Sequence, residues 1–178
     1  GQGEETFSNI LTAFTNGSDL SEIPSISWRD PATNECVINE AELAFDKNLD
    51  RFPSPYLKGL FDDLLNSRKD LKFQAIIETN RGCPFACTFC DWGDADVNKV
   101  KKYSLERVYA EIDWLSKNKV FYIYGADANF GIFYDRDMKI AEYMAEICLD
   151  SGFPKYLMIN YTKNSHEKIV NLAEAFKK

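Results

Sequence analysis

Apolar side chains recur at helical spacing near the start of the chain, and the stripe ends at Asn16 and Gly17. Its positions are Phe7, Ile10, Leu11 and Phe14. Residues three and four apart share one face of a helix, and an asparagine followed by glycine is a common stop signal. We therefore predict a short amphipathic helix within residues 1–20, at the end of a preceding unit.

The helical period is lost over residues 21–50, where Pro24 and Pro31 stand among scattered acidic residues. Such a stretch is typical of an extended connector. A second helical stripe then follows two prolines and ends near residue 66. Its apolar positions are Tyr56, Leu57, Leu60, Phe61, Leu64 and Leu65. We predict a linker and a helix over residues 21–66.

Strand and helix patterns alternate over residues 67–178. Predicted strands cover residues 71–79, 120–124 and 156–160. Predicted helices cover residues 104–118, 137–151 and 164–178, with start signals at Ser104 and at Asn164 with Glu167, and a stop at Gly152. Alternating strands and helices require parallel strands and right-handed crossovers, so the fold class is α/β. Three βα units form only part of a TIM-like barrel, which leaves the third strand as an open edge.

The charge balance excludes several partners. The 178 residues include 21 basic and 28 acidic ones, a net charge of −7, which provides no basic footprint for nucleic acid or an anionic membrane. The longest apolar stretch, 120–124, is far shorter than the roughly 20 residues that cross a bilayer. We expect a soluble protein without nucleic-acid or membrane partners. Because the chain begins at Gly1 rather than methionine, we interpret it as a fragment.

Three of the five cysteines lie close together in the sequence CPFACTFC, at Cys83, Cys87 and Cys90. An odd number of cysteines suits a reducing compartment, and we expect a cytoplasmic protein. Gly82 and Pro84 favour a loop that brings the three thiolates together. Soft sulfur ligands at this spacing select an iron–sulfur cluster or zinc. The loop follows the first predicted strand, at the sheet edge where α/β folds place active sites.

This CxxxCxxC motif, with Phe89 before its last cysteine, resembles that of radical S-adenosylmethionine (radical SAM) enzymes. The wider string ETNRGCPFACTFCDWG, residues 78–93, is similar to the subgroup that carries an amino-terminal cobalamin-binding domain. Residues 1–7 resemble the closing segment of that domain, and residues 52–62 resemble the linker before the barrel. The resemblance implies that residues 1–20 are a carboxyl-terminal remnant of a cobalamin-binding-type domain. It also implies that residues 67–178 are the first half of a radical SAM barrel.

The resemblance further implies the cofactors and their ligands. Cys83, Cys87 and Cys90 would bind three irons of a [4Fe–4S] cluster, and S-adenosylmethionine would chelate the fourth. One-electron reduction would then release methionine and a 5′-deoxyadenosyl radical, with the cofactors carrying the chemistry. A donor such as flavodoxin or ferredoxin would supply the electron. The expected activity is methyl transfer to an unactivated carbon of a small molecule or peptide, with cobalamin bound mainly outside this chain; ring formation or rearrangement is a further option.

The residues after the second predicted strand lie where the family contacts the methionyl amino group. There the usual glycine-glycine-glutamate is replaced by a segment that contains Gly125, Asp127 and Asn129. The two polar side chains are two residues apart and face the same way in extended chain, so either could accept a hydrogen bond from the ammonium. The resemblance also places Phe89 near the adenine. No catalytic residue is assigned.

Each of these interpretations has a simpler alternative. The motif could form a zinc or iron–sulfur module without catalysis, with Cys36 or Cys148 as a fourth ligand. Phe89 could belong to the core, and the polar pair after the second strand could be solvated turn residues. Arg81 could offset the charge of the cluster or be an exposed loop residue, and Asp91 and Trp92 could shape the pocket or stabilise the loop. His166 is expected on the surface.

Overall fold

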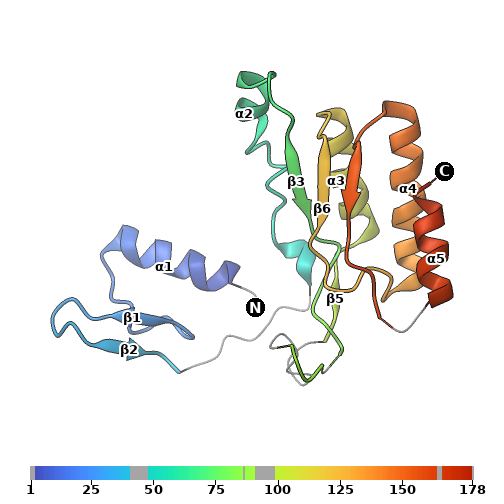
Figure 1. Ribbon diagram of the computed structural model, residues 1–178. Helices are drawn as coiled ribbons and strands as arrows, with labels where there is room; N and C mark the ends of the chain where they lie inside the picture. The colour runs from blue at the N-terminus through green and yellow to red at the C-terminus, as the bar shows by residue number, and fades with distance from the viewer. Residues whose placement is uncertain (1–2, 41–47, 86, 91–98, 164–165, 178) are drawn as a thin grey trace. The chain divides into compact units, whose positions relative to one another are not determined.

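The computed structural model describes residues 3–40, 48–85, 87–90, 99–163 and 166–177, and it divides into two compact units, Gly1–Lys47 and Asn48–Lys178 (Figure 1). Asp91, Trp92, Asn164 and Lys178, which carried sequence-based predictions, lie outside the described residues. The boundary between the units falls inside the segment that we interpreted as a linker.

The first unit combines one helix with a hairpin. Helix α1, Glu4–Asn16, ends where predicted, because Gly17 adopts the left-handed conformation at φ 65°. Strands β1, Ser27–Arg29, and β2, Cys36–Ile38, pair antiparallel, so the stretch interpreted as an extended connector contains a hairpin. The turn is held by the Asp30 carboxylate, which accepts hydrogen bonds from the backbone of Ala32 and the hydroxyl of Thr33. Strands this short carry too little period to be recognised in the sequence.

The second unit opens with a short 3₁₀ helix, η1, Leu49–Arg51, and a run of turns before α2, Asp62–Ser67. The helix predicted from the apolar stripe is therefore much shorter than expected. Gly59 interrupts it with φ 71°, a left-handed conformation that ends a helix. Two apolar side chains of the turns, Tyr56 and Phe61, line a cavity of about 280 Å³ against β3, whereas Leu60 is exposed.

A parallel sheet forms the centre of the second unit. Its strands are β3, Gln74–Ile77, β6, Tyr122–Gly125, and β7, Tyr156–Met158, in the order β3-β6-β7. Helices α3, Leu105–Lys117, α4, Tyr134–Ser151, and α5, His166–Ala175, follow the strands in turn. All three predicted strands and their helices are confirmed, and the α/β class with them. The third strand is a sheet edge, as expected, while closure into part of a barrel stays a prediction.

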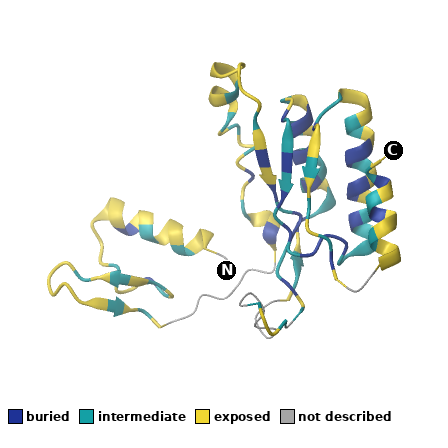
Figure 2. Ribbon diagram, in the orientation of Figure 1, coloured by how far each residue is buried: buried dark blue, intermediate teal, exposed yellow. Residues whose placement is uncertain are grey.

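The helices cover one face of the sheet, and the core lies between the sheet and the helices (Figure 2). Ala75, Ile77 and Ile123 point toward this core and are buried, whereas Ile76 and Met158 point to the other face and are more than half exposed. Alternate residues of a strand face opposite sides, so one face is packed and the other is open. Among the described residues, no helix is long and apolar enough to span a membrane.

Candidate functional site

The cysteine loop begins where β3 ends, at the carboxyl edge of the parallel sheet (Figure 1). The short strand β4, Asn80–Arg81, pairs antiparallel with β5, Lys101–Lys102, and together they form the base of the loop. Gly82 then turns the chain with φ 110°, and a Cβ there would lie 3.3 Å from the backbone of Lys99 and Val100. This position therefore requires glycine, and it directs the next residue, Cys83, into the protein.

The three cysteines of the motif differ in exposure. Cys83 is buried, Cys87 and Cys90 are half-buried, and all three are free thiols. The Cys90 amide donates to the Cys87 carbonyl at 3.0 Å, which closes a turn between the last two. Within the described part of the chain, no three Cys, His, Asp or Glu side chains converge on a point that would hold a single metal ion.

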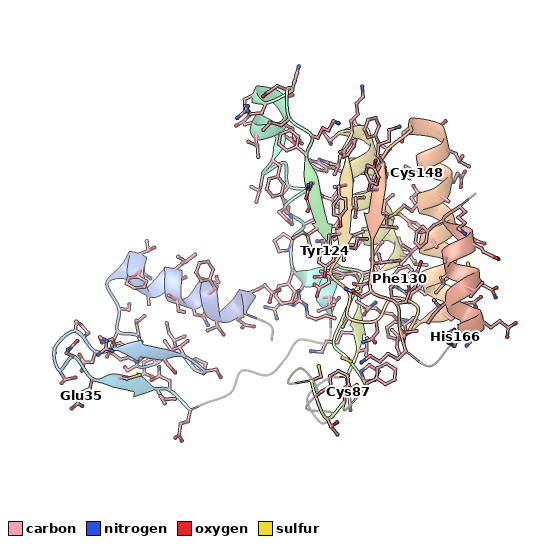
Figure 3. All side chains as sticks on the ribbon, viewed as in Figure 1. Glu35, Cys87, Tyr124, Phe130, Cys148 and His166 are labelled. Atoms are coloured by element: carbon pink, nitrogen blue, oxygen red, sulfur yellow. The ribbon has the colours of Figure 1, made fainter. Side chains whose placement is uncertain are left out.

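Cys148 lies far from the motif and has a local role. It is near the carboxyl end of α4, whose start adjoins the site, and fourteen residues of helix span about 20 Å. Figure 3 shows Cys148 and Cys87 at opposite ends of the second unit. The Cys148 thiol contacts the Pro154 carbonyl at 3.7 Å, and burial raises its pKa. Such a thiol is an inert packing group, so it is not a fourth ligand of the motif in this structure.

Asp127, on the loop after β6, fastens the start of the cysteine loop. Its carboxylate is 2% exposed and accepts hydrogen bonds from both backbone amides of Thr79 and Asn80, at 2.6 and 2.9 Å. The Thr79 hydroxyl and the Asn80 side-chain amide donate to the other oxygen. Burial raises the pKa of Asp127 to about 6, against the lowering effect of these hydrogen bonds. Both oxygens are thus committed to one turn.

Arg136, in the first turn of α4, holds the same turn from another side. Its guanidinium donates to the carbonyls of Thr79 and Tyr103, at 3.0 and 2.8 Å. It also pairs with buried Asp137, whose second oxygen accepts from the Gly131 amide at 2.8 Å. Arg136 was not predicted as a site residue, because its partners are main-chain atoms more than thirty residues away. No local motif reveals such a contact.

Asn129 is the side chain that touches the motif from the β6 loop. Its Nδ2 lies 3.1 Å from the Cys83 sulfur, as a donor to it, and the residue is 1% exposed. Its Oδ1 is buried and has no hydrogen-bond partner among the described residues. A buried acceptor without a partner is costly unless a ligand or water satisfies it. The sequence placed Asp127 and Asn129 together, and the structure gives them different surroundings.

Other residues singled out from the sequence occupy simpler places. Gly125, the last residue of β6, packs so closely on β7's continuation that a Cβ would lie 2.7 Å from an Ile159 methyl. Phe89 is 87% exposed, which excludes a core role in this structure. Arg81 is neither a free charge nor an exposed loop residue: it pairs with Glu78 at 2.6 Å. His166 is exposed at the start of α5, as expected.

Lys163, which was not among the predicted site residues, brings a positive charge to the motif. It lies on the loop after β7, and its ammonium donates to the Cys87 sulfur at 3.1 Å. The same nitrogen lies 5.7 Å from the ring centroids of both Phe85 and Phe89. The hydrogen bond to Cys87, together with the charges of the three cysteines, raises the pKa of Lys163. The only signal in the sequence was a lysine just beyond the third predicted strand.

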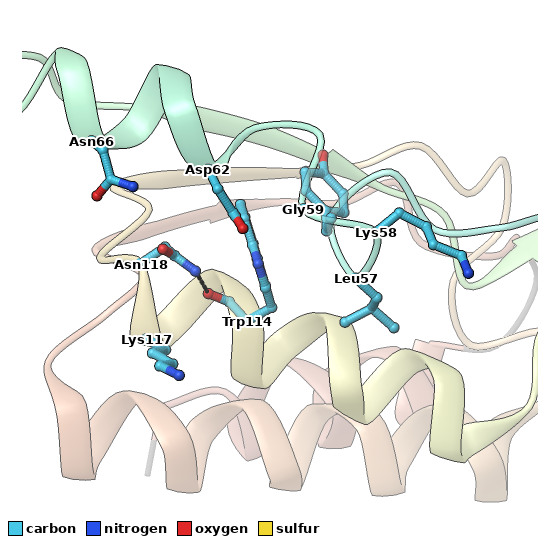
Figure 4. Close-up of a pocket in the computed structure, with 9 residues that line it drawn as sticks. Leu57, Lys58, Gly59, Asp62, Asn66, Trp114, Lys117 and Asn118 are labelled. Carbon is cyan, nitrogen blue, oxygen red and sulfur yellow. Dashed lines mark hydrogen bonds between the residues drawn. The ribbon is translucent and has the colours of Figure 1, made fainter.

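A depression of about 520 Å³ lies elsewhere, between the turns before α2 and the carboxyl end of α3 (Figure 4). It is lined by Tyr56, Leu57, Lys58, Gly59, Asp62, Asn66, Trp114, Lys117 and Asn118. In a parallel βα unit this end of the helix lies at the amino ends of the strands, opposite the cysteine loop. None of the candidate site residues lines it.

Comparison with known proteins finds relatives that are methyltransferases. It is 35% identical over 99% of its length to the cobalamin-dependent radical SAM methyltransferase TokK of Streptomyces tokunonensis. It is 34% identical over the same share to the 2-(S-pantetheinyl)-carbapenam-3-carboxylate methyltransferase of Streptantibioticus cattleyicolor. It spans 26% of each, about a quarter of the length of these curated relatives. No family model matches the chain.

The fold has a counterpart among solved structures. The radical S-adenosylmethionine methyltransferase TsrM of Kitasatospora setae, solved with tryptophan and a cofactor analogue, matches with a TM-score of 0.62 at 17% identity. The match covers 99% of this chain and 34% of that one. A second structure of TsrM, with cobalamin and a [4Fe–4S] cluster bound, matches equally well. At this identity the likeness concerns the arrangement of helices and strands.

Proposed function

We propose that this chain, a homologue of a segment of cobalamin-dependent radical SAM methyltransferases, belongs to the radical SAM superfamily and holds a [4Fe–4S] cluster at residues 83–90. Cys83, Cys87 and Cys90 would supply its three protein ligands. The observation that carries the proposal is a loop with three free thiols at the carboxyl edge of a parallel sheet. Thiolates are the ligands that iron–sulfur clusters take, and this edge is where α/β folds place their sites.

The surroundings of the thiols suit S-adenosylmethionine as the partner of the cluster. The cofactor carries an ammonium group, and the buried Oδ1 of Asn129 is an acceptor without a partner beside Cys83. We assign the cofactor's ammonium to this oxygen rather than to Asp127, whose oxygens are already bonded to Thr79 and Asn80. The cluster and S-adenosylmethionine, when bound there, would supply the radical chemistry that removes hydrogen from a substrate.

The chain's own residues would position the cysteine ligands and stabilise their negative charge. Asp127 and Arg136 hold the turn at Thr79, so Cys83 is presented in one position. The Asn129 amide donates to the Cys83 sulfur, and a donor at this position stabilises a thiolate over a thiol. Phe89 and Gly125 stay proposed contacts of the cofactor, because Phe89 is exposed on the cysteine loop and Gly125 ends β6 at the same edge of the sheet.

The whole protein would be a methyltransferase, as its relatives' names indicate. We propose methyl transfer to an unactivated carbon of a small molecule or peptide, with cobalamin held mainly outside this chain and the three βα units forming part of a barrel. The structural neighbour was solved with tryptophan, a small molecule. A flavodoxin or ferredoxin in a reducing cytoplasm would supply the electron, which agrees with five free cysteines.

Metal analysis tests the proposal. After anaerobic reconstitution, the chain should contain about four irons, and added S-adenosylmethionine should perturb the spectrum of the cluster because it binds the open iron. Zinc in place of iron, or a cluster that ignores S-adenosylmethionine, would support a metal-binding module without catalysis and contradict the proposal. Asn129→Ala should weaken the response to S-adenosylmethionine more than it lowers iron content.

A further inference from the structure

Lys163 reaches the cysteine loop from a different part of the chain. It is separated from Cys87 by 76 residues, and the parallel pairing of β7 with β6 brings the two together. Its ammonium contacts three residues of the loop, the sulfur of Cys87 and the rings of Phe85 and Phe89. The ammonium is attracted electrostatically by the sulfur and by the two aromatic rings, and these attractions hold it beside the loop.

We propose that Lys163 fixes a positive charge beside Cys87 and thereby raises the reduction potential of the cluster bound at Cys83, Cys87 and Cys90. The inference rests on the proposed function and deepens it. Reduction adds one electron and makes or breaks no bond, so it adds one negative charge to the cluster and its thiolates. A fixed positive charge next to a ligand sulfur stabilises that state relative to the oxidised one.

Lys163 is a cation in direct contact with a sulfur of the motif. Arg81 precedes the motif, but its guanidinium is paired with Glu78, and Arg136 is paired with Asp137 and bonded to two carbonyls. The charge of these arginines is therefore balanced by carboxylates. Lys163, in contrast, directs its ammonium to the Cys87 sulfur and to the rings of Phe85 and Phe89 in the cysteine loop.

The experiment is a spectroelectrochemical titration of the reconstituted chain and three variants. Lys163→Gln removes the charge, Lys163→Arg keeps it, and Lys168→Gln removes the same charge from α5, where the ammonium lies 5.1 Å from the ring of Tyr134. Lys163→Gln should hold up to about tenfold less reduced cluster at a fixed potential, equivalent to about 59 mV for one electron. Lys163→Arg and Lys168→Gln should have the same reduction potential as the original chain.

Because Lys163 is exposed, the difference between the original chain and Lys163→Gln should shrink as salt is added. Loss of iron in Lys163→Gln that Lys163→Arg restores would also support the role of the charge. Equal potentials in the Gln variants at 163 and 168, or equal shifts in Gln and Arg at 163, would overturn the inference and leave the proposed function standing. If the original chain assembles no cluster, the proposed function fails and the inference fails with it.

Discussion

Asp127 and Asn129 lie two residues apart on one loop, and their roles are separated by the partners of their polar atoms. Both oxygens of Asp127 accept hydrogen bonds from Thr79 and Asn80, whereas Oδ1 of Asn129 accepts none among the described residues. A carboxylate with this many donors holds a turn, and a buried acceptor without a donor is ready for a ligand. The polar pair therefore divides into an anchor and a candidate binding group.

The stability of the fold should depend on the titration of Asp127. Burial raises its pKa to about 6, above the usual value for aspartate, so between about pH 4 and pH 6 the folded state holds a proton that the unfolded state has lost. The contribution of Asp127 to the free energy of unfolding is therefore greatest below this window and falls as the pH rises through it. Asp127→Asn has no carboxyl group at this position, so its free energy of unfolding should lack this pH dependence.

Urea unfolding of the metal-free chain and of Asp127→Asn at about pH 4 and pH 7 measures the effect. The difference in unfolding free energy between the two proteins should change by on the order of 2–3 kcal/mol, in favour of the variant at the higher pH. The same difference at both pH values would show that Asp127 does not titrate as its burial implies.

The cysteine assignment makes a second prediction at this scale. Cys87→Ala should abolish cluster assembly, because it removes one of three protein ligands. Cys148→Ala should retain the iron content and cost on the order of 1 kcal/mol of stability through lost packing. Iron analysis and thermal unfolding of the two variants separate these effects, and equal iron loss in both would refute the assignment of ligands.

Helix α3 shows how a local signal sets an element boundary. Ser104 precedes its first residue, and the Ser104 hydroxyl accepts a hydrogen bond from the Arg107 amide at 3.2 Å. The Ser104 amide in turn donates to the carboxylate of Asp50 in η1, which ties the start of the helix to η1. The cap was visible in the sequence, and its second contact was not.

Loss of this cap should destabilise the second unit. Ser104→Ala should lower the free energy of unfolding by about 1 kcal/mol, because the Arg107 amide loses its acceptor. Ser104→Asp keeps a capping oxygen and should restore most of the stability, although its charge faces Asp50. Chemical denaturation measures both, and an alanine variant as stable as the original chain would mean that the cap contributes nothing.

At the scale of the whole second unit, the sheet has two edges with different surroundings. The Tyr56 hydroxyl donates to the Ile76 carbonyl at 2.7 Å and accepts from the Ile76 amide at 3.1 Å, so it covers the outer edge of β3. Burial raises the pKa of this phenol. Among the described residues, β7 forms the other edge and pairs with β6 on its inner side. The segment before β3 thus protects one edge that would otherwise present unpaired backbone groups.

Tyr56→Phe tests how much this cover contributes. Loss of both hydrogen bonds to Ile76 should lower the free energy of unfolding by about 0.5–1.5 kcal/mol. Tyr122→Phe is a matched control, because its hydroxyl contacts only the weak acceptor sulfur of Met158 in the described structure, and it should cost less. Equal losses in denaturant titrations of the two variants would show that the edge cover has no special value.

The sequence by itself determined the order of strands and helices in the second unit, the cap at Ser104, the stop at Gly152 and the cysteine motif on the first βα loop. These features follow from local rules: apolar periodicity, capping chemistry, glycine at left-handed positions and short ligand spacing. The hairpin of β1 and β2 and the shortened α2 escaped these rules, because a three-residue strand has too little period and one left-handed glycine outweighs an apolar stripe.

Only the tertiary structure decided which side chains surround the cysteines. Asp127, Arg136 and Lys163 come from loops and a helix end that lie 40 to 80 residues from their partners in the motif segment, and parallel pairing of β3, β6 and β7 brings them to one edge. Hydrogen bonds and charges act over a few ångströms in space, whatever the separation along the chain. A linear pattern can therefore name the metal ligands, while the groups that hold and tune them become visible only in the fold.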